Sequence, residues 1–345
     1  MFMSKIVFVV GAGASNEFGL PIGSELAMQI SRHLRFKVDR YGSFESGDYG
    51  LYEAIQLAAR DEGKGTREYL RACRAIQEAL PTAVSIDTFL EVHEGDHEIE
   101  FCGKLGIAYS ILKAERSSYL RAGGADDHAP PLFTSGAVLK SWISVFVRMV
   151  QVGISKRNIE RALENVTFVI FNYDRCVEHY LFHWFQLFYR VDAARAAEIL
   201  SAARFFHPYG VAGKLPWQNY AGSPVPFGAE LGSSSLLSVS AGIRTYSEQI
   251  ADQTTQEAIH ASIVNTDRLV FLGFGFGEQN MKFLTLPRQA KIRRVFGTAY
   301  TVSKSNQEEF EMRIANSLVN GALDIDLQQV SSAQMLSDHD AVFVK

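Results

Sequence analysis

Polar side chains that could do chemistry stand directly after two apolar runs of the sequence. Asn172 and Asp174 bracket Tyr173 immediately after VTFVIF, and His207 follows the short run RFF and precedes Pro208. Open α/β sheets bind their ligands beyond the carboxyl ends of the strands, so both places are where site residues are expected. Histidine can exchange a proton near pH 7, and proline restricts the backbone beside it. The polar residues are therefore candidates for one site.

Each of these residues also has an interpretation without function. An Asx side chain commonly caps a helix, here one predicted to begin near Arg175, and Asp174 is the better candidate for that cap. A lone histidine is more often packed or exposed than catalytic. His207 stands out because it shares a predicted strand end with the other polar residues.

A glycine-rich turn follows the first apolar run, KIVFVV. Gly11, Gly13 and Gly19 form G-x-G-x5-G before a helical periodicity, a context in which the backbone can approach a pyrophosphate and the helix N-terminus can receive its charge. The spacing differs from G-x-G-x-x-G, and no G-K-[ST] follows, which disfavours ATP or GTP hydrolysis. The alternative is a tight turn that binds nothing.

A second glycine-rich turn, in LGFGFGEQN, follows a later apolar strand. Gly273, Gly275 and Gly277 suit close approach to a nucleotide, and Glu278 and Asn280 can bond hydroxyl groups.

The elements that must position these residues are apolar strands alternating with helices. We predict strands at 166–172 and 268–272 and around 204–206, a helix at 248–265, and loop at 210–245 and in the polar stretch 122–131. This order predicts an α/β fold: a Rossmann-like, mostly parallel sheet with helices on both faces. The Rossmann-like domain comprises 1–35 and 166–345, and 36–165 is a large helical insertion.

Composition narrows the class of protein. The 345 residues are 47% hydrophobic and 21% charged, which excludes a disordered, collagen-like or coiled-coil chain. The net charge of -4 gives no basic field for direct nucleic-acid binding. The three cysteines form no CxxC pair, so neither a disulfide framework nor a four-cysteine zinc site is expected. Without a signal peptide or an apolar run of about 18–20 residues, the protein is expected to be soluble and cytoplasmic.

Other histidines are weaker candidates. His93 and His97 lie four residues apart among carboxylates, which a solvated acidic stretch explains. His179 and His183 share a helical face with Glu178, but the order is not HExxH. The aromatic residues between 180 and 189 are expected to pack in a core or at a subunit interface.

Taken together, the ordered motifs resemble those of sirtuin-like NAD-consuming proteins. GAGAS with GLP, FNYD, His-x-x-Gly and GFGFGEQN look like the divergent, zinc-less bacterial branch that acts in anti-phage defence, and SIDTFL at 85–90 is similar to a recurrent segment of that branch. Unlike sirtuin deacylases, the chain has no CxxC pairs, IGSEL after GLP, Phe171 before Asn172, and Pro208 after His207.

The resemblance implies an NAD glycohydrolase, with NAD as substrate and no zinc, that cleaves NAD to nicotinamide and ADP-ribose. It implies that Asn172 orients the attacking water or the ribose hydroxyls, that Asp174 supports the loop and that His207 is the general base. The expected pyrophosphate contacts are Gly11, Ala12, Gly13 and Ser15, and the expected adenosine contacts are Gly273, Gly275 and Glu278.

Two other functions remain open: a module that senses NAD or ADP-ribose without turnover and, third, a protein deacylase. Retention of both Asn172 and His207 favours turnover, because a sensor needs neither. The resemblance further implies an NAD-depleting antiviral effector that is a regulated homo-oligomer. Its possible partners include a HerA-type ATPase or an Argonaute.

Overall fold

The computed structural model describes residues 2, 4–40, 43–121, 133–219, 222–292, 294–319 and 323–344. Its centre is a six-stranded sheet in the order β5-β4-β1-β6-β7-β8, with every neighbouring pair parallel. The strands are β1 (Ile6–Val10), β4 (Val166–Ile170), β5 (Arg204–Phe206), β6 (Arg268–Leu272), β7 (Arg294–Thr298) and β8 (Asp324–Gln328). The chain thus builds outward from β1 in both directions, as in doubly wound Rossmann-like sheets, and the predicted fold class is confirmed.

The central strand shows why these segments fold as they do. Val7 and Val9 point into the hydrophobic core on one face of the sheet, whereas Ile6, Phe8 and Val10 point into the core on the other. All five are buried. Because helices cover both faces, the strand reads as a continuous apolar run instead of an alternating one.

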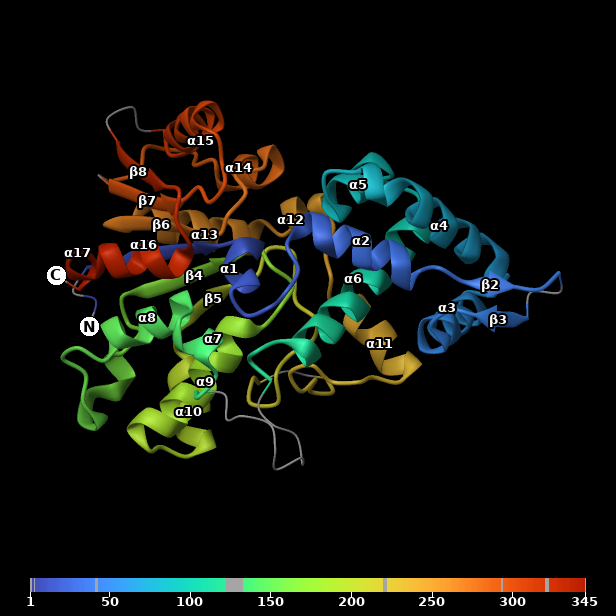
Figure 1. Ribbon diagram of the computed structural model, residues 1–345, viewed down its shortest axis with the longest axis horizontal. Coiled ribbons are helices and arrows are strands. Elements are labelled where there is room, and N and C mark those ends of the chain that lie inside the picture. The colour runs from blue at the N-terminus through green and yellow to red at the C-terminus, as the bar shows by residue number, and fades with distance from the viewer. Residues whose placement is uncertain are drawn as a thin grey trace.

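Helices pack on both faces of the sheet (Figure 1). One face is covered by α8 (Trp142–Val150), α9 (Cys176–Tyr189), α10 (Ala193–Ser201), α16 (Ser332–Asp338) and α17 (Asp340–Phe343), with α7 (Gly136–Leu139) and the 3₁₀ segment Lys156–Arg161 beside them. The opposite face carries α13 (Gln253–Val264), α14 (Glu278–Leu284) and α15 (Lys304–Ser317).

A second group of elements extends to one side of the sheet and is called the helical lobe here (Figure 1). It contains α2 (Gly23–His33), the hairpin β2 (Lys37–Val38) and β3 (Phe44–Ser46), α3 (Tyr49–Asp61), α4 (Thr66–Ala79), the 3₁₀ turn Leu80–Thr82, α5 (Ile86–Val92), α6 (His97–Ser117) and α11 (Ser233–Ser240). Its core is continuous with the second face of the sheet. The short α12 (Tyr246–Ala251) contacts α5 at the junction.

The packing crosses the predicted limits of the insertion at both ends. The glycine turn is followed by a short helix, α1 (Ala12–Asn16), and then by α2, which packs against α4 and α6 of the helical lobe although it precedes residue 36. Conversely, α8 lies before residue 165 but packs on the sheet, where Phe146 contacts the rings of Phe8 and Phe168. The helical lobe is therefore built from the region around α3–α6 together with α2 and α11.

Three local predictions need correction or qualification. The segment 210–245 contains α11, so it is not all loop. The predicted helix at 248–265 is two helices, because the side chain of Asp252 accepts a hydrogen bond from the amide of Thr255 and starts α13 anew. The stretch 122–131 lies outside the described residues. Among the helices that are described, none is long and apolar enough to cross a membrane.

Candidate functional site

The candidate site lies where the carboxyl ends of β1, β4, β5 and β6 meet. Hydrogen bonds of the sheet continue just past the strands, since Phe171 donates to the carbonyl of Val10 and Gly11 donates to the carbonyl of Leu272, both at 2.9 Å. The residues that follow these strands therefore lie at the same height along the strand direction. This edge includes the point between β1 and β6 where the winding of the sheet reverses, at which such folds bind ligands.

The two glycine-rich turns pack directly against each other. The amide of Gly13 donates to the carbonyl of Gly273 at 2.9 Å, and a Cβ on Gly11 would lie only 2.5 Å from that carbonyl oxygen. Gly273 has φ +55°, and a Cβ there would lie 2.0 Å from the amide nitrogen of Ala14. These glycines are required for the contact between the turns, and the amides of Gly11 and Gly13 are already hydrogen-bonded within the protein.

Asn172 connects β4 to the first glycine-rich turn. Its side-chain Nδ2 donates to the hydroxyl of Ser15 at 2.8 Å, and both residues are buried. Among the described residues, no hydrogen bond reaches Oδ1 of Asn172. The structure therefore brings together two predicted site residues that are 157 positions apart in the chain, and leaves an amide oxygen to accept a further bond.

His207 lies beside Asn172 and is paired with a carboxylate. Its Nε2 is 2.6 Å from Oε1 of Glu178, and its Nδ1 is 3.4 Å from the main-chain oxygen of Asn172. Burial raises the pKa of Glu178, but the charge and hydrogen bond of His207, with smaller effects of backbone bonding and of Lys214, outweigh burial and hold that pKa below its usual 4.5. Oε2 of Glu178 is buried without a hydrogen-bond partner among the described residues.

The predicted helix cap at Asp174 is not formed, because the N-cap of α9 is Arg175, which has no side-chain cap hydrogen bond and comes one residue after Asp174. Oδ1 of Asp174 accepts a hydrogen bond from the amide of Cys176 at 3.1 Å, at the start of α9, and Asp174 is buried. Asp174 thus holds the turn that carries Asn172.

The helical lobe reaches the same turn through α5. The hydroxyl of Tyr173 donates to Asp87, which lies in the first turn of that helix, within SIDTFL. Burial raises the pKa of Asp87, and the bond from Tyr173 only partly offsets this effect. The main-chain oxygen of Tyr173 accepts a bond from Ala212 at 3.0 Å, which ties in the segment after His207.

The turn after β6 is more open. A Cβ on Gly275 or Gly277 would have no neighbour within 4 Å, and Glu278 is exposed. Asn280 accepts a bond from the hydroxyl of Tyr209 at 2.7 Å, which joins this turn to the His207 segment. The predicted adenosine contacts Gly275 and Glu278 therefore lie on an accessible surface, whereas Gly273 packs against the first turn.

Sequence reasoning missed two residues of this site. Glu178 was considered only with His179 and His183, but it pairs with His207, 29 positions away. An acidic residue in the first turn of the helix after FNYD was the available signal. Asp87 was not singled out within SIDTFL. The available signal was a carboxylate in the first turn of a helix.

The cysteines and the other histidines have different surroundings. The three cysteines are free and buried, with Sγ of Cys73 and Cys102 at 3.4 Å inside the helical lobe. His93 bonds the carbonyl of Phe89, and His179 stacks on Phe227 with ring centroids 4.1 Å apart. Over the part of the chain that the structure describes, no group of three or more His, Cys, Asp or Glu residues could hold a metal ion.

Comparison with known proteins adds no family. No family model matches the chain, and no curated protein is significantly similar to it. We therefore infer the function from the geometry of the site and from the motifs.

Proposed function

We propose that this protein is an NAD glycohydrolase, which cleaves the bond between nicotinamide and ribose. The observation that carries the proposal is the position of Asn172, whose side chain bonds Ser15 of the glycine turn and whose main-chain oxygen lies 3.4 Å from His207. A group suited to ribose hydroxyls or water thus lies between a phosphate-type turn and an acid–base residue, at the sheet edge where dinucleotides bind.

Cleavage of the bond between nicotinamide and ribose needs no nucleophile from the protein. The electron pair of the glycosidic bond leaves with nicotinamide, which becomes neutral, and the ribose passes through an oxocarbenium-like state that water attacks at its anomeric carbon. Oδ1 of Asn172 would orient that water or the ribose hydroxyls. Because Glu178 occupies Nε2 of His207, Nδ1 is the nitrogen that accepts the proton of the water, once it has moved away from the main-chain oxygen of Asn172 that it faces at 3.4 Å. The products are nicotinamide, ADP-ribose and a proton.

The rest of the nucleotide would occupy the neighbouring turns. We place the pyrophosphate at Ala12 and Ser15, since the amides of Gly11 and Gly13 are engaged within the protein. The adenosine would lie along Gly275 and Glu278, where the backbone is open. The resemblance to zinc-less sirtuin-like defence proteins supports the same assignment and extends it to a regulated, oligomeric NAD-depleting effector in the bacterial cytoplasm, acting alone or with an ATPase or Argonaute partner.

One observation favours a second function, a nucleotide sensor without turnover. Both ring nitrogens of His207 face acceptors, and its side chain is 8% exposed. In this arrangement no ring nitrogen is directed at open space, so turnover requires a movement that frees Nδ1.

The test is nicotinamide release by the purified full-length protein, compared with Asn172→Ala, His207→Ala and Glu178→Gln. We expect each of the first two changes to lower turnover by roughly a hundred- to ten-thousandfold, as for loss of a positioned acid–base group. NAD affinity by calorimetry should stay near the parent value, because the phosphate contacts come from the first turn. A smaller loss is expected for Glu178→Gln, which keeps a bond to the histidine.

Melting temperatures measured on the same proteins separate catalysis from folding. If Asn172→Ala loses only about 1 kcal/mol of stability and keeps the parent rate per folded molecule, the side chain serves only the turn. If the parent binds NAD tightly and never releases nicotinamide, including in lysate from phage-infected cells, the hydrolase proposal is wrong and the sensor is supported.

A further inference from the structure

A fully buried ion pair joins the helical lobe to the residue that follows FNYD. Arg175 and Glu115, which lies near the end of α6, have side chains that are 1% and 0% exposed. Oε1 of Glu115 accepts bonds from the main-chain amide of Arg175 at 3.2 Å and from its Nε at 3.0 Å, and Oε2 accepts from Nη2. The carboxylate of Glu115 therefore binds both the main chain and the side chain of Arg175.

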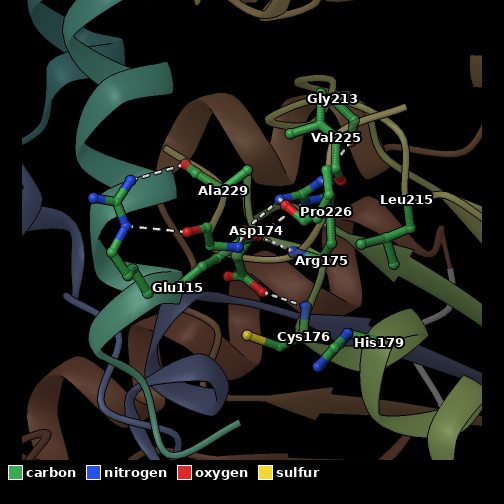
Figure 2. A network of polar contacts seen from close by, with 12 residues as sticks. Glu115, Asp174, Arg175, Cys176, His179, Gly213, Leu215, Val225, Pro226 and Ala229 are labelled. Atoms are coloured by element: carbon green, nitrogen blue, oxygen red, sulfur yellow. Dashed lines mark hydrogen bonds and ion pairs between the residues drawn. The ribbon is translucent and has the colours of Figure 1, made fainter. Parts of the chain in front are cut away.

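The same guanidinium holds the segment that continues from His207. Nη1 of Arg175 donates to the carbonyl of Val225 at 2.6 Å and to that of Gly213 at 3.4 Å, and Nη2 donates to the carbonyl of Pro226 at 3.3 Å. Figure 2 shows this network, with Gly213, Val225 and Pro226 lying against Arg175. Every nitrogen of the guanidinium thus has a partner in another segment.

Glu115 and its neighbour fix that segment from the other side. Oε2 of Glu115 accepts a bond from the amide of Gly228 at 3.0 Å, and Arg116 donates to the carbonyls of Gly228 and Ala229 at 3.1 and 3.0 Å. Gly228 has φ +64°, and a Cβ there would lie 2.7 Å from the backbone of Arg116. The close contact with α6 therefore depends on glycine at this position.

A buried ion pair is a poor source of stability, because desolvation of the two charges offsets their attraction. Its geometry instead specifies where three chain segments sit relative to one another. Two of these segments carry Asn172 and His207, whose mutual placement the Nδ1 contact at 3.4 Å reports. We propose that Glu115 and Arg175 are positioning residues for the site. Through them the helical lobe sets the relative placement of Asn172 and His207.

The decisive variant is the double substitution Glu115→Met with Arg175→Met. It removes both buried charges together and keeps similar volume, a change that folded proteins often tolerate. It also frees the main chain at Gly228 and Val225. We expect kcat for nicotinamide release to fall by roughly ten- to hundredfold, as for a small misplacement of catalytic groups, with NAD affinity unchanged. We also expect the Cε1–H signal of His207 in NMR spectra at pH 7 to move.

The matched control is Lys104→Met, which breaks an ion pair between α6 and Glu248 that has no contact with the FNYD turn. It should leave kcat and the His207 signal at their parent values. Arg175→Lys provides a second test if the double variant does not fold, because lysine keeps the charge opposite Glu115 but loses the forked bonds. It should lower kcat without weakening NAD binding.

This inference rests on the proposed function only for its kinetic readout. If the parent releases no nicotinamide, the glycohydrolase proposal fails, and the His207 signal, assigned with His207→Gln, still decides the positioning role. Parent-like kcat and an unmoved His207 signal in a folded double or Arg175→Lys variant would overturn the proposal, because the pair would then serve folding alone.

Discussion

The two halves of the candidate site differ in how they are held. Around β4 and β5, Asn172 is buried, the side chain of His207 is 8% exposed, and both residues bond other segments. The helical lobe bonds two residues that follow Asn172, namely Tyr173 and Arg175. In the turn after β6, Gly275 and Glu278 are exposed, and a Cβ on Gly275 would meet nothing within 4 Å. The half assigned to bond cleavage is closed, and the half assigned to the adenosine is open.

This difference indicates how a nucleotide would enter. Binding can begin at the open turn with little rearrangement, whereas contact with the closed half requires its polar bonds to be exchanged for bonds to the ligand. The rate of bond cleavage then depends on a conformational change of the closed half more than on the affinity for the nucleotide. Regulation of such a protein is expected to act on the closed half.

The largest effect is expected from a variant that leaves one charge of the buried Glu115–Arg175 pair without its partner. Arg175→Met without a change at Glu115 buries an unpaired carboxylate, which should cost about 3–5 kcal/mol in the free energy of unfolding. Urea titration checks this. Lys104→Met removes the pair between α6 and Glu248, whose side chains are 16% and 48% exposed, and should cost at most about 1 kcal/mol. Equal losses in the two variants would mean that the closed half is not held by this pair.

A second experiment sharpens the comparison at two glycines of one turn. Gly273→Ala should lose more than about 2 kcal/mol, because alanine at positive φ costs roughly 1–2 kcal/mol and its Cβ would also collide with Ala14. Gly275→Ala has open space and should change stability by less than about 0.5 kcal/mol. It should instead weaken NAD binding in calorimetry. The assignment of Gly275 to the ligand is wrong if NAD affinity stays at the parent value.

The smallest expected effect concerns pH and a histidine beside the closed half. Burial lowers the pKa of His179 from 6.5 to about 3, so the unfolded chain takes up its proton first as pH falls. Stability should therefore decline below pH 6.5, by about 1.4 kcal/mol per pH unit for this group. His179→Gln should flatten the pH dependence of chemical unfolding between pH 6.5 and 5.

The fold could be predicted where burial on two sides gives a strong signal. VTFVIF and RLVFL are mostly apolar because helices cover both faces of β4 and β6, and their order with the helices between them predicts the parallel sheet. The helix SSSLLSVS was missed because serine is a weak helix former and the segment lies between Gly232 and Gly242. The lobe contacts of α2 also could not be predicted, since the amphipathic pattern does not say which surface covers a helix.

For the site, the place of a residue directly after a strand predicted where it lies in the structure. Its hydrogen-bond partner could not be predicted from the sequence. Asn172, Asp174 and His207 follow strands that are adjacent in the sheet, so the topology alone brings them near one another. Glu178 was interpreted as part of a helical face, because its partner is set by how α9 and β5 pack, which no local pattern encodes. The same holds for Glu115, whose role depends on a contact with Arg175 across 60 positions.

The central position of β1 has a consequence for how the chain is made. Ile6 pairs with Val166 on one side and with Arg268 on the other, so β1 leaves the ribosome long before both of its neighbours have been made. At translation rates of about 5–20 residues per second, β6 follows on the order of ten seconds or more later. Throughout that interval an apolar strand waits with at least one unpaired edge, while the helical lobe can already fold beside it. We expect the nascent chain to need protection by chaperones during this period, and folding to slow with the long sequence separation of these contacts.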